Sequence, residues 1–168
     1  MAVWMGALLV FLICIDMGVK QYIEDTFKGE EERDTRIPRI VLRKVHNKGF
    51  LLNVLEKRPE IVRMGSVAAG GFVVLYDIWL FWKNGRFFRK LGMVFVTAGA
   101  VSNIYDRMIR GKVVDYIGFK SKHSFLSNIT ANLADVYVVI GALLTEGSLI
   151  CARKKTKERK RRKRKETA

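Results

Sequence analysis

The chain alternates between long apolar stretches and segments crowded with charge. The apolar stretches cover about 1–23, 65–82, 91–106 and 131–151. A helix needs about 20 apolar residues to cross the hydrocarbon core of a bilayer, so the pattern predicts four transmembrane helices. The third stretch is the shortest. We expect it to end at a polar site inside the protein, because lipid does not accept exposed backbone polar groups.

The connection between the first two stretches, residues 24–64, predicts structure of its own. Its segment IPRIVLRKVHN (37–47) is rich in β-branched residues and predicts one or two strands. Residues 49–65 begin with apolar positions at helical spacing and continue with charges, which indicates an amphipathic helix at the membrane interface. The expected fold class is an α-helical integral membrane protein with four transmembrane helices, a small extracytoplasmic β-sheet and this interfacial helix.

Composition agrees with a membrane protein and adds a strong basic bias. Of the 168 residues, 49% are hydrophobic, yet 31 Lys and Arg against 16 Asp and Glu give a formal net charge of +15. Such figures are ordinary for a small membrane protein with basic flanks. The charges gather in 24–63, in KNGRFFRK (83–90) and in the tail that starts at Arg153. We therefore predict one membrane domain, residues 1–152, followed by a disordered basic tail, residues 153–168.

The basic residues also predict which side each segment occupies. Short loops rich in Lys and Arg stay in the cytoplasm, and four spans put the 83–90 loop and both termini on that one side. The connections 24–64 and 106–130 are then outside. A cleaved signal peptide is the alternative for the first stretch, but no Lys or Arg precedes its apolar run and no small-x-small cleavage site follows it.

The basic tail is compatible with two kinds of partner. Clustered Lys and Arg neutralise phosphates in nucleic-acid-binding proteins, but this tail has no interleaved aromatic residues and no folded module to position it. Contact with anionic lipid headgroups is the simpler account. We therefore expect membrane lipids, and no nucleic acid, as partners.

The sequence indicates no metal or cofactor chemistry. Cys14 and Cys151 lie in apolar stretches without metal-like spacing, and we interpret them as core residues. His46 and His123 are isolated, and no Gly-rich phosphate loop is present. We expect neither a metal nor an organic cofactor.

Ionisable residues inside or beside the spans are rare and costly, so each is a hypothesis for a functional site. Asp16 and Lys20 lie four residues apart on one helical face. They form either an ion pair near the outer interface, with Lys20 reaching towards water, or the edge of a substrate site. Asp77 is interpreted as an interfacial carboxylate offset by Lys83 or Arg86.

Asp115 and Asp135 are the more informative pair. Asp115 lies in the apolar, strand-like patch GKVVDYIGF on the outer side, and Asp135 lies in the first turn of the fourth span, which is entered from that side. Two carboxylates held close together do not both ionise easily. One can then activate a water molecule while the other polarises a scissile carbonyl. The alternative is that each is a helix cap or a surface carboxylate.

The residues around these carboxylates resemble a known family. SNIYDRMIRGKVVDYI (102–117) and NLADVYVVIG (132–141) are similar to the N-x-x-D-R, V-V-D-[FY] and N-x-A-D motifs of lipoprotein signal peptidases, also called signal peptidase II. Upstream, DMGVK (16–20) resembles the family's D-x-x-x-K, and HNKGF (46–50) resembles its N-x-G segment. Order, spacing and the four predicted spans agree with the family over nearly the whole membrane domain.

The resemblance implies an aspartyl peptidase of the bacterial cytoplasmic membrane, with its active site on the extracytoplasmic side. Such enzymes remove signal peptides from diacylglyceryl-modified prolipoproteins and cut before the lipidated cysteine. We expect a monomer that needs no cofactor. The resemblance gives catalytic roles to Asp115 and Asp135, and substrate-binding or supporting roles to Asn47, Gly49, Asn103, Arg107, Asn132, Asp16 and Lys20.

The chain departs from the family pattern at several places. Ser102 stands where the family has glycine, and FLLN (50–53) replaces small residues and an aromatic. The acidic GEEERD segment and the long basic tail are not family features. A relative that binds lipidated peptides without cutting them is the main alternative function. A small transporter with carboxylate proton relays ranks lower, because the carboxylates gather on one side and no internal repeat is visible.

Overall fold

The computed structural model describes residues 2–29, 31–49, 55, 57–123 and 127–166. Its long helices are α1 (Ala2–Thr26), α2 (Pro59–Phe81), α3 (Phe87–Tyr105) and α5 (Leu133–Glu166). A five-residue π-helix, η2 (Asp106–Arg110), follows α3 directly. The strands β1 (Glu32–Asp34), β2 (Ile40–Asn47), β3 (Val113–Phe119) and β4 (Thr130–Ala131) form one antiparallel sheet in that order.

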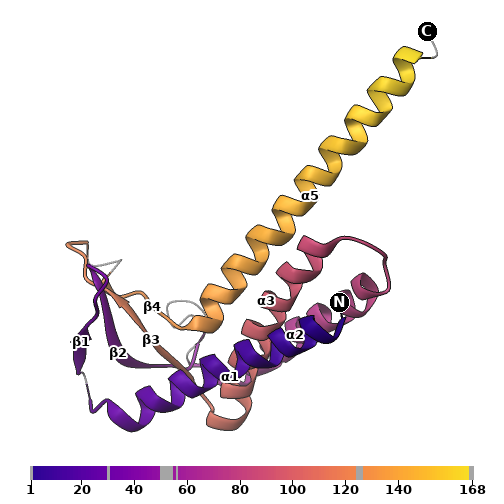
Figure 1. Cartoon of the computed structure of the whole chain (residues 1–168). Coiled ribbons are helices and arrows are strands. Elements are labelled where there is room, and N and C mark those ends of the chain that lie inside the picture. The colour runs from indigo at the N-terminus through magenta and orange to yellow at the C-terminus, as the bar shows by residue number, and fades with distance from the viewer. Residues whose placement is uncertain (1, 30, 50–54, 56, 124–126, 167–168) are drawn as a thin grey trace.

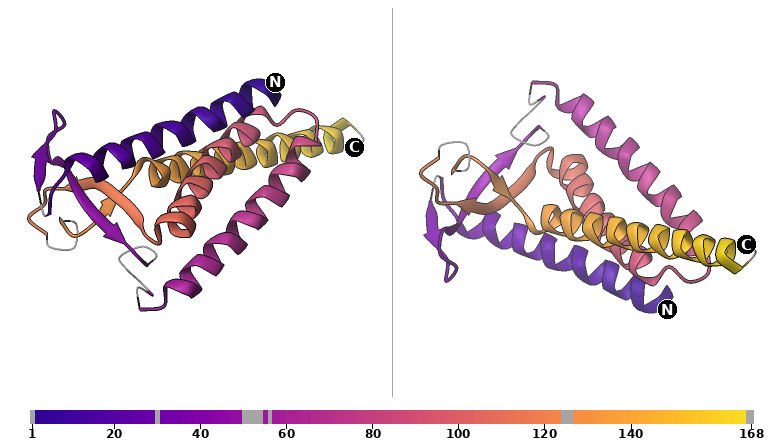
Figure 2. Two further views of the ribbon diagram at one scale, coloured as in Figure 1. Left: turned by 90° about the horizontal axis from the view of Figure 1, so that it is seen from below. Right: turned by 90° about the horizontal axis from the view of Figure 1, so that it is seen from above.

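The sheet lies at one end of the helices, and the N-terminus and the α2–α3 connection lie at the other end (Figures 1 and 2). Helix α3 is the central element and packs against α1, α2 and α5. Nine of its 19 residues are buried, against five of 25 in α1 and three of 23 in α2. The outer helices therefore leave most of their surface free to face lipid, whereas α3 faces protein.

Three of the described helices are long and apolar enough to cross a membrane, namely α1, α2 and the first part of α5. They correspond to the first, second and fourth predicted spans. Helix α3 forms where the third span was predicted but is not in this group. Its position explains the difference, because a helix enclosed by its neighbours can carry polar side chains such as Thr97 and Ser102 on buried faces.

The predicted small sheet is confirmed, and β2 falls within the β-branched segment 37–47. The predicted interfacial helix at 49–65 includes residues 50–54 and 56, which lie outside the described residues. Its last part, from Pro59 onward, is instead the first two turns of α2. Proline suits the first turn of a helix, since its missing N–H would have no partner there, and α2 accordingly starts earlier than the predicted second span.

The basic tail differs from the predicted disorder. Helix α5 continues without a break from the apolar span through Arg153 to Glu166. Lys, Arg and Glu have high helix propensities, and no Gly or Pro follows Gly147. Because the apolar span already supplies the helix nucleus, each further residue only has to propagate the helix.

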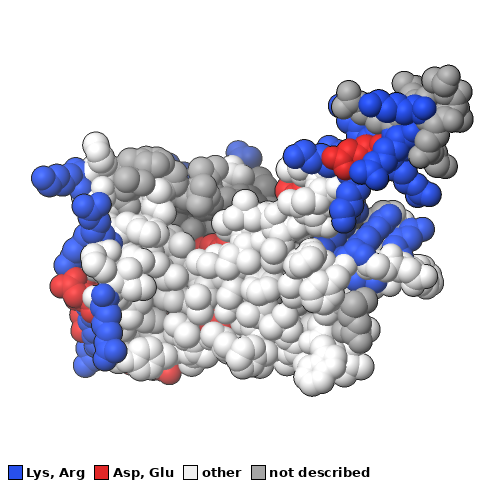
Figure 3. Space-filling model, turned by 45° about the horizontal axis from the view of Figure 1, so that its top comes forward, with Lys and Arg blue, Asp and Glu red and all other residues white. Residues whose placement is uncertain are grey.

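The surface between the two ends of the molecule is largely uncharged (Figure 3). Large exposed apolar side chains on α1, α2 and α5, among them Trp4, Phe72 and Leu143, account for it. Cys14 and Cys151 are also exposed, so their interpretation as core residues was wrong. Apolar residues in a bundle of this size outnumber its interior positions, and a bilayer accepts the remainder at the surface.

Glycines bring α3 and α5 into backbone contact. Gly92 and Gly99 on α3 face Gly141 and Ala134 on α5, respectively. A Cβ atom added at Gly92 would lie 2.7 Å from the Gly141 carbonyl oxygen, which is closer than real Cβ contacts. Small residues at helix contacts of membrane proteins allow this close packing.

Replacing Gly141 by Ala should lower the thermal stability of the protein in detergent, because the new Cβ would lie 2.8 Å from the Val96 backbone nitrogen. We expect a loss of about 1–3 kcal/mol from overpacking. Gly147, on the same helix, has no atom within 4 Å of a built Cβ, so Gly147→Ala should leave stability unchanged or slightly higher. Equal melting temperatures for the two variants would contradict the close contact.

Candidate active site

Asp115 and Asp135 meet at the sheet end of the helices. Asp115 lies in β3 with 4% of its surface exposed, and Asp135 lies in the first turn of α5. Asn132, which is fully buried, joins them. Its side-chain amide donates to Asp115 Oδ1 at 2.6 Å, and its backbone N–H donates to Asp135 Oδ2 at 3.1 Å. One residue therefore fixes the relative positions of both carboxylates.

Asn132 and Asp135 also cap the start of α5 reciprocally. The Asn132 side-chain oxygen accepts the Asp135 N–H at 3.0 Å, while the Asp135 carboxylate accepts the Asn132 N–H. This is a capping box, and a carboxylate in the first turn is favoured by the positive end of the helix dipole. Asp135 is therefore held by the local structure of α5 as well as by its neighbours in space.

The next two N–H groups of α5 are bound by residues from elsewhere in the chain. The Leu133 N–H donates to the Tyr116 hydroxyl at 3.1 Å, and the Ala134 N–H donates to Asp16 Oδ1 at 3.1 Å. The Tyr116 hydroxyl in turn donates to Asp16 at 3.2 Å. These contacts fix the end of α5 against α1 and β3, so the position of Asp135 depends on three elements.

Asn103 donates its side-chain amide to Asp135 Oδ1 at 3.0 Å. Its side-chain oxygen accepts from Lys20 Nζ at 2.9 Å and from the Asn132 amide at 3.3 Å. An ammonium group can only donate hydrogen bonds, so Lys20 selects the orientation of Asn103 in which the amide hydrogens face Asp135. Lys20 thereby acts on the carboxylate through Asn103.

Lys20 lies at the centre of a buried charge network. Its ammonium pairs with Asp16 at 2.8 Å and with Asp106 at 3.0 Å, and Lys20 and Asp16 have no exposed surface. Arg110 lies 3.5 Å from the other oxygen of Asp106, so two acidic and two basic groups balance. The ion pair between Asp16 and Lys20 agrees with one of the two sequence interpretations. Its location does not, because Lys20 is enclosed by protein and does not reach towards water.

Ser102 belongs to the same network, although sequence reasoning gave it no role. Its hydroxyl donates to Asp16 Oδ2 and accepts from Lys20 at 3.3 Å. Tyr116 was likewise noted only as part of a motif. Burial and the neighbouring Asp16 raise the pKa of Tyr116 above its usual value, so it stays a neutral hydrogen-bond donor. The sequence did offer one signal for Tyr116. It directly follows Asp115 on a predicted strand, and because side chains alternate between faces of a strand, it lies on the opposite face from Asp115.

Asn47 holds Asp115 from the opposite side. Its amide donates to Asp115 Oδ2 at 3.1 Å, and its oxygen accepts the Gly49 N–H at 2.9 Å. Arg107 donates to the Gly49 carbonyl at 3.2 Å and to the Asn103 carbonyl at 3.4 Å. All the predicted site residues are thus brought into one connected cluster: Asp16, Lys20, Asn47, Gly49, Asn103, Arg107, Asp115, Asn132 and Asp135.

Asp77 lies elsewhere, and its predicted setting was wrong. Its carboxylate accepts a hydrogen bond from the Thr97 hydroxyl and so joins α2 to α3. Lys83 and Arg86 lie instead over the Trp79 ring, 5.6 Å and 5.4 Å from its centre. Cation–π contact with an aromatic ring is an alternative partner for a cation at the membrane interface.

Burial, and after it the negative charge of Asp135, raise the pKa of Asp115 to about 6. Hydrogen bonds from Asn47 and Asn132 and the charge of Lys20 oppose this rise. The carboxyl can therefore hold a proton close to neutral pH while a second carboxylate lies beside it. Among the residues that the structure describes, no group of three or more His, Cys, Asp or Glu side chains is placed to hold a metal ion.

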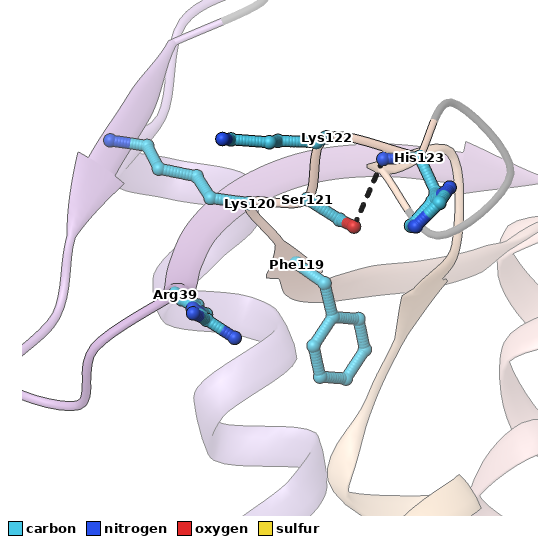
Figure 4. Close-up of a pocket in the computed structure, with 6 residues that line it drawn as sticks. All are labelled: Arg39, Phe119, Lys120, Ser121, Lys122 and His123. Carbon is cyan, nitrogen blue, oxygen red and sulfur yellow. Dashed lines mark hydrogen bonds between the residues drawn. The ribbon is translucent and has the colours of Figure 1, made fainter.

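A separate pocket lies at the far end of the strands from this cluster (Figure 4). It measures about 450 Å³ and is lined by Arg39, Phe119, Lys120, Ser121, Lys122 and His123. Lys120 is paired with the exposed Asp34, and the His123 N–H donates to Ser121. The strands separate it from Asn47 and Asp115, since Ile40 pairs with Phe119 and Asn47 pairs with Val113. This basic pocket is not part of the carboxylate site.

Apolar helices joined to a buried polar cluster at one end are the architecture of a membrane protein with a polar site, and comparison with known proteins specifies its class as a peptidase. A family model described as "Signal peptidase (SPase) II" matches residues 8–150. The chain belongs to the signal peptidase II family.

Relatives and solved structures agree with this assignment. The lipoprotein signal peptidases of Brucella ovis and Brucella melitensis are each 32% identical over 144 residues, which is 84% of this chain and 86% of theirs. The fold is similar to that of a bacterial membrane enzyme solved by the in meso method at 2.3 Å resolution, with a TM-score of 0.74, 22% identity and 87% of both chains covered. A 1.9 Å structure of the same description gives a TM-score of 0.71 over 86% of this chain and 91% of that one, again at 22% identity.

Replacing Asp135 by Asn should lower the pKa of Asp115 from about 6, because the charge of Asp135 is one of the two effects that raise it. Asp115 should then lose its proton at a lower pH than in the wild type. Infrared difference spectroscopy of the protonated carboxyl band during a pH titration measures this shift. Asp34→Asn, at an exposed position, should leave the titration unchanged. An unaltered titration in Asp135→Asn would mean that the two charges do not interact.

Replacing Lys20 by Met should strongly destabilise the fold, because it leaves Asp16 and Asp106 buried without their shared cation. We expect a loss of about 3–5 kcal/mol, as for other broken buried ion pairs. Thermal unfolding in detergent measures it, with Lys28→Met at an exposed position as the control. Adding Asp16→Asn should recover part of the loss. If both lysine variants melt at the wild-type temperature, the network does not stabilise the protein.

Proposed function

We propose that the protein removes signal peptides from diacylglyceryl-modified prolipoproteins and cuts before the lipidated cysteine. Asp115 and Asp135 act as the general acid and base. The observation that carries the proposal is the carboxylate pair joined by Asn132, in which the pKa of Asp115 is raised to about 6. Relatives that are 32% identical over most of the chain are named lipoprotein signal peptidases, which supports the substrate class.

The two carboxylates divide the work of hydrolysis. The ionised member takes a proton from a water molecule, and that water attacks the scissile carbonyl carbon. The protonated member donates a hydrogen bond to the carbonyl oxygen and then supplies a proton to the leaving amine. The C–N bond breaks, the carbonyl carbon gains a bond to the oxygen of the water, and the amine nitrogen gains a bond to hydrogen. The pair of carboxyl groups finishes with one proton, as it began. Asn47, Asn103 and Asn132 keep the acceptor oxygens in place throughout.

The remaining predicted residues have positioning roles in this proposal. Gly49 orients Asn47, and Arg107 bridges the Gly49 and Asn103 carbonyl groups. Its planar guanidinium is a suitable donor for a substrate carbonyl. Asp16 and Lys20 support the site without touching the substrate, because both are fully buried.

The membrane arrangement in this proposal has four spans, with α3 as the third, in the bacterial cytoplasmic membrane. Two features support it. The N-terminus and the α2–α3 connection lie at the end opposite the carboxylates (Figure 2), and the 83–90 segment and the tail are basic, as cytoplasmic segments are. The carboxylate pair is then extracytoplasmic, and a monomer can receive a lipidated substrate from the bilayer without moving its acyl chains out of the hydrocarbon.

The direct test is cleavage of a purified, diacylglyceryl-modified prolipoprotein by the full chain in detergent. Asp115→Asn and Asp135→Asn should each lower the rate by at least about 10²-fold, which is the usual contribution of a general acid or base. Mass spectrometry of the products locates the cut before the lipidated cysteine. Asp34→Asn should keep the wild-type rate, and the unmodified prolipoprotein should be a poor substrate.

Binding of the lipidated substrate without cleavage by the wild type would contradict the proposal and favour a lipopeptide-binding relative. Cleavage that persists in either aspartate variant would reject the two-carboxylate mechanism. Circular dichroism and melting temperatures of the variants show whether a loss of activity reflects chemistry or unfolding.

A further inference from the structure

A pocket lies where α5 leaves the bundle, at the end of the molecule opposite the carboxylate pair. It measures about 390 Å³ and is formed between the first turn of α3 and the start of the basic part of α5. Lys and Arg side chains gather at this end of the molecule (Figure 3). Its lining residues are Arg89, Leu149, Ala152, Arg153, Thr156 and Lys157.

Arg89 is the central observation. Only 9% of its surface is exposed, and its buried Nε has no hydrogen-bond partner. No ion pair with Arg89 occurs among the residues that the structure describes. Its neighbour Lys90 shows the contrast, because it donates to the Phe81 carbonyl at 3.4 Å and lies 5.4 Å from the centre of the Phe81 ring. A buried charged donor without an acceptor is costly, so an anionic acceptor beside Arg89 would be favoured.

The surroundings of Arg89 strengthen its positive potential. Arg153 and Lys157 are four residues apart on one face of α5 and both line the pocket, an arrangement in which like charges repel. Helix α3 begins at Phe87 with no side-chain cap and no acidic residue in its first turn. The positive end of its dipole is therefore not offset locally. Together these groups fit a phosphate, which accepts several charge-assisted hydrogen bonds at once.

The pocket also has an apolar side. Leu149 and Ala152 line it, and Ala152 is shared with a neighbouring groove of about 580 Å³. That groove runs between Phe88 and the apolar part of α5, including Leu143 and Leu144. A phosphate site that continues into an apolar groove beside a membrane span matches an amphiphilic ligand.

We propose that this pocket binds the phosphate of an anionic phospholipid, with one acyl chain in the groove beside Phe88. Arg89, Arg153 and Lys157 hold the headgroup in the leaflet that contains the basic α2–α3 connection. Basic pockets between membrane helices on the cytoplasmic side bind anionic headgroups in this way. The site is remote from the carboxylate pair, and its occupation does not depend on the proposed peptidase activity.

Native mass spectrometry of the full chain, titrated with phosphatidylglycerol or with phosphatidylcholine of the same acyl chains, tests the proposal. The wild type should bind one phosphatidylglycerol about tenfold more tightly than phosphatidylcholine, the size expected for loss of a charged hydrogen bond. Arg89→Gln should abolish this preference, and Arg89→Lys should retain part of it. The matched control is Arg162→Gln, which removes the same charge from an exposed tail position and should keep the preference.

Melting temperatures separate the possible outcomes. Phosphatidylglycerol should raise the melting temperature of the wild type and of Arg162→Gln more than that of Arg89→Gln, as expected for a ligand that binds the folded state. An equal loss of preference in the Arg89 and Arg162 variants would overturn the proposal in favour of diffuse attraction to the tail. Inorganic phosphate alone should give no stabilisation. If it stabilises the wild type as well as the lipid does, the ligand is free phosphate and the lipid site is rejected.

Discussion

A single buried ammonium group, that of Lys20, determines much of the arrangement around the carboxylates. It lies between Asp16 and Asp106 and faces the Asn103 side-chain oxygen. By balancing Asp16, it allows that carboxylate to remain buried and to bind the first turn of α5. By orienting Asn103, it directs the side-chain amide of Asn103 towards Asp135. The Lys20 ammonium thus links the end of α1 to the start of α5 and to the orientation of Asn103. A substitution far from the carboxylates in sequence therefore acts on them through these neighbours.

Close packing and chemistry share the same helix face. Gly99 and Asn103 are four residues apart on α3, so they lie on one side of the helix. Gly99 lies against the backbone of Ala134, the residue before Asp135. The missing side chain at Gly99 lets α3 approach α5 closely enough for the short Asn103 side chain to reach the carboxylate. Packing at this position therefore sets a hydrogen-bond distance as well as stability.

The sequence predicts the parts of this structure that depend on local pattern and on motif spacing. Long apolar stretches indicated α1, α2 and α5, and the spaced Asn and Asp residues indicated the cluster at the sheet end. The partners of Ser102 and the isolation of Arg89 could not be predicted, because they depend on contacts between residues more than 50 positions apart. The helix in the basic tail could not be predicted from its charge either. The high helix propensity of Lys and Arg favours a helix, whereas repulsion between their like charges opposes one.

The hydrogen bonds at the first turn of α5 affect which inhibitors the site can accept. The backbone N–H groups of Asn132, Leu133, Ala134 and Asp135 are all bound by side chains of the protein. These four N–H groups are therefore not available as an oxyanion hole, and a compound that presents a negatively charged tetrahedral centre to the first turn of α5 would meet the acidic side chains of Asp115 and Asp135. An uncharged hydroxyl group, which can donate to one carboxylate and accept from the other, matches the local electrostatics far better.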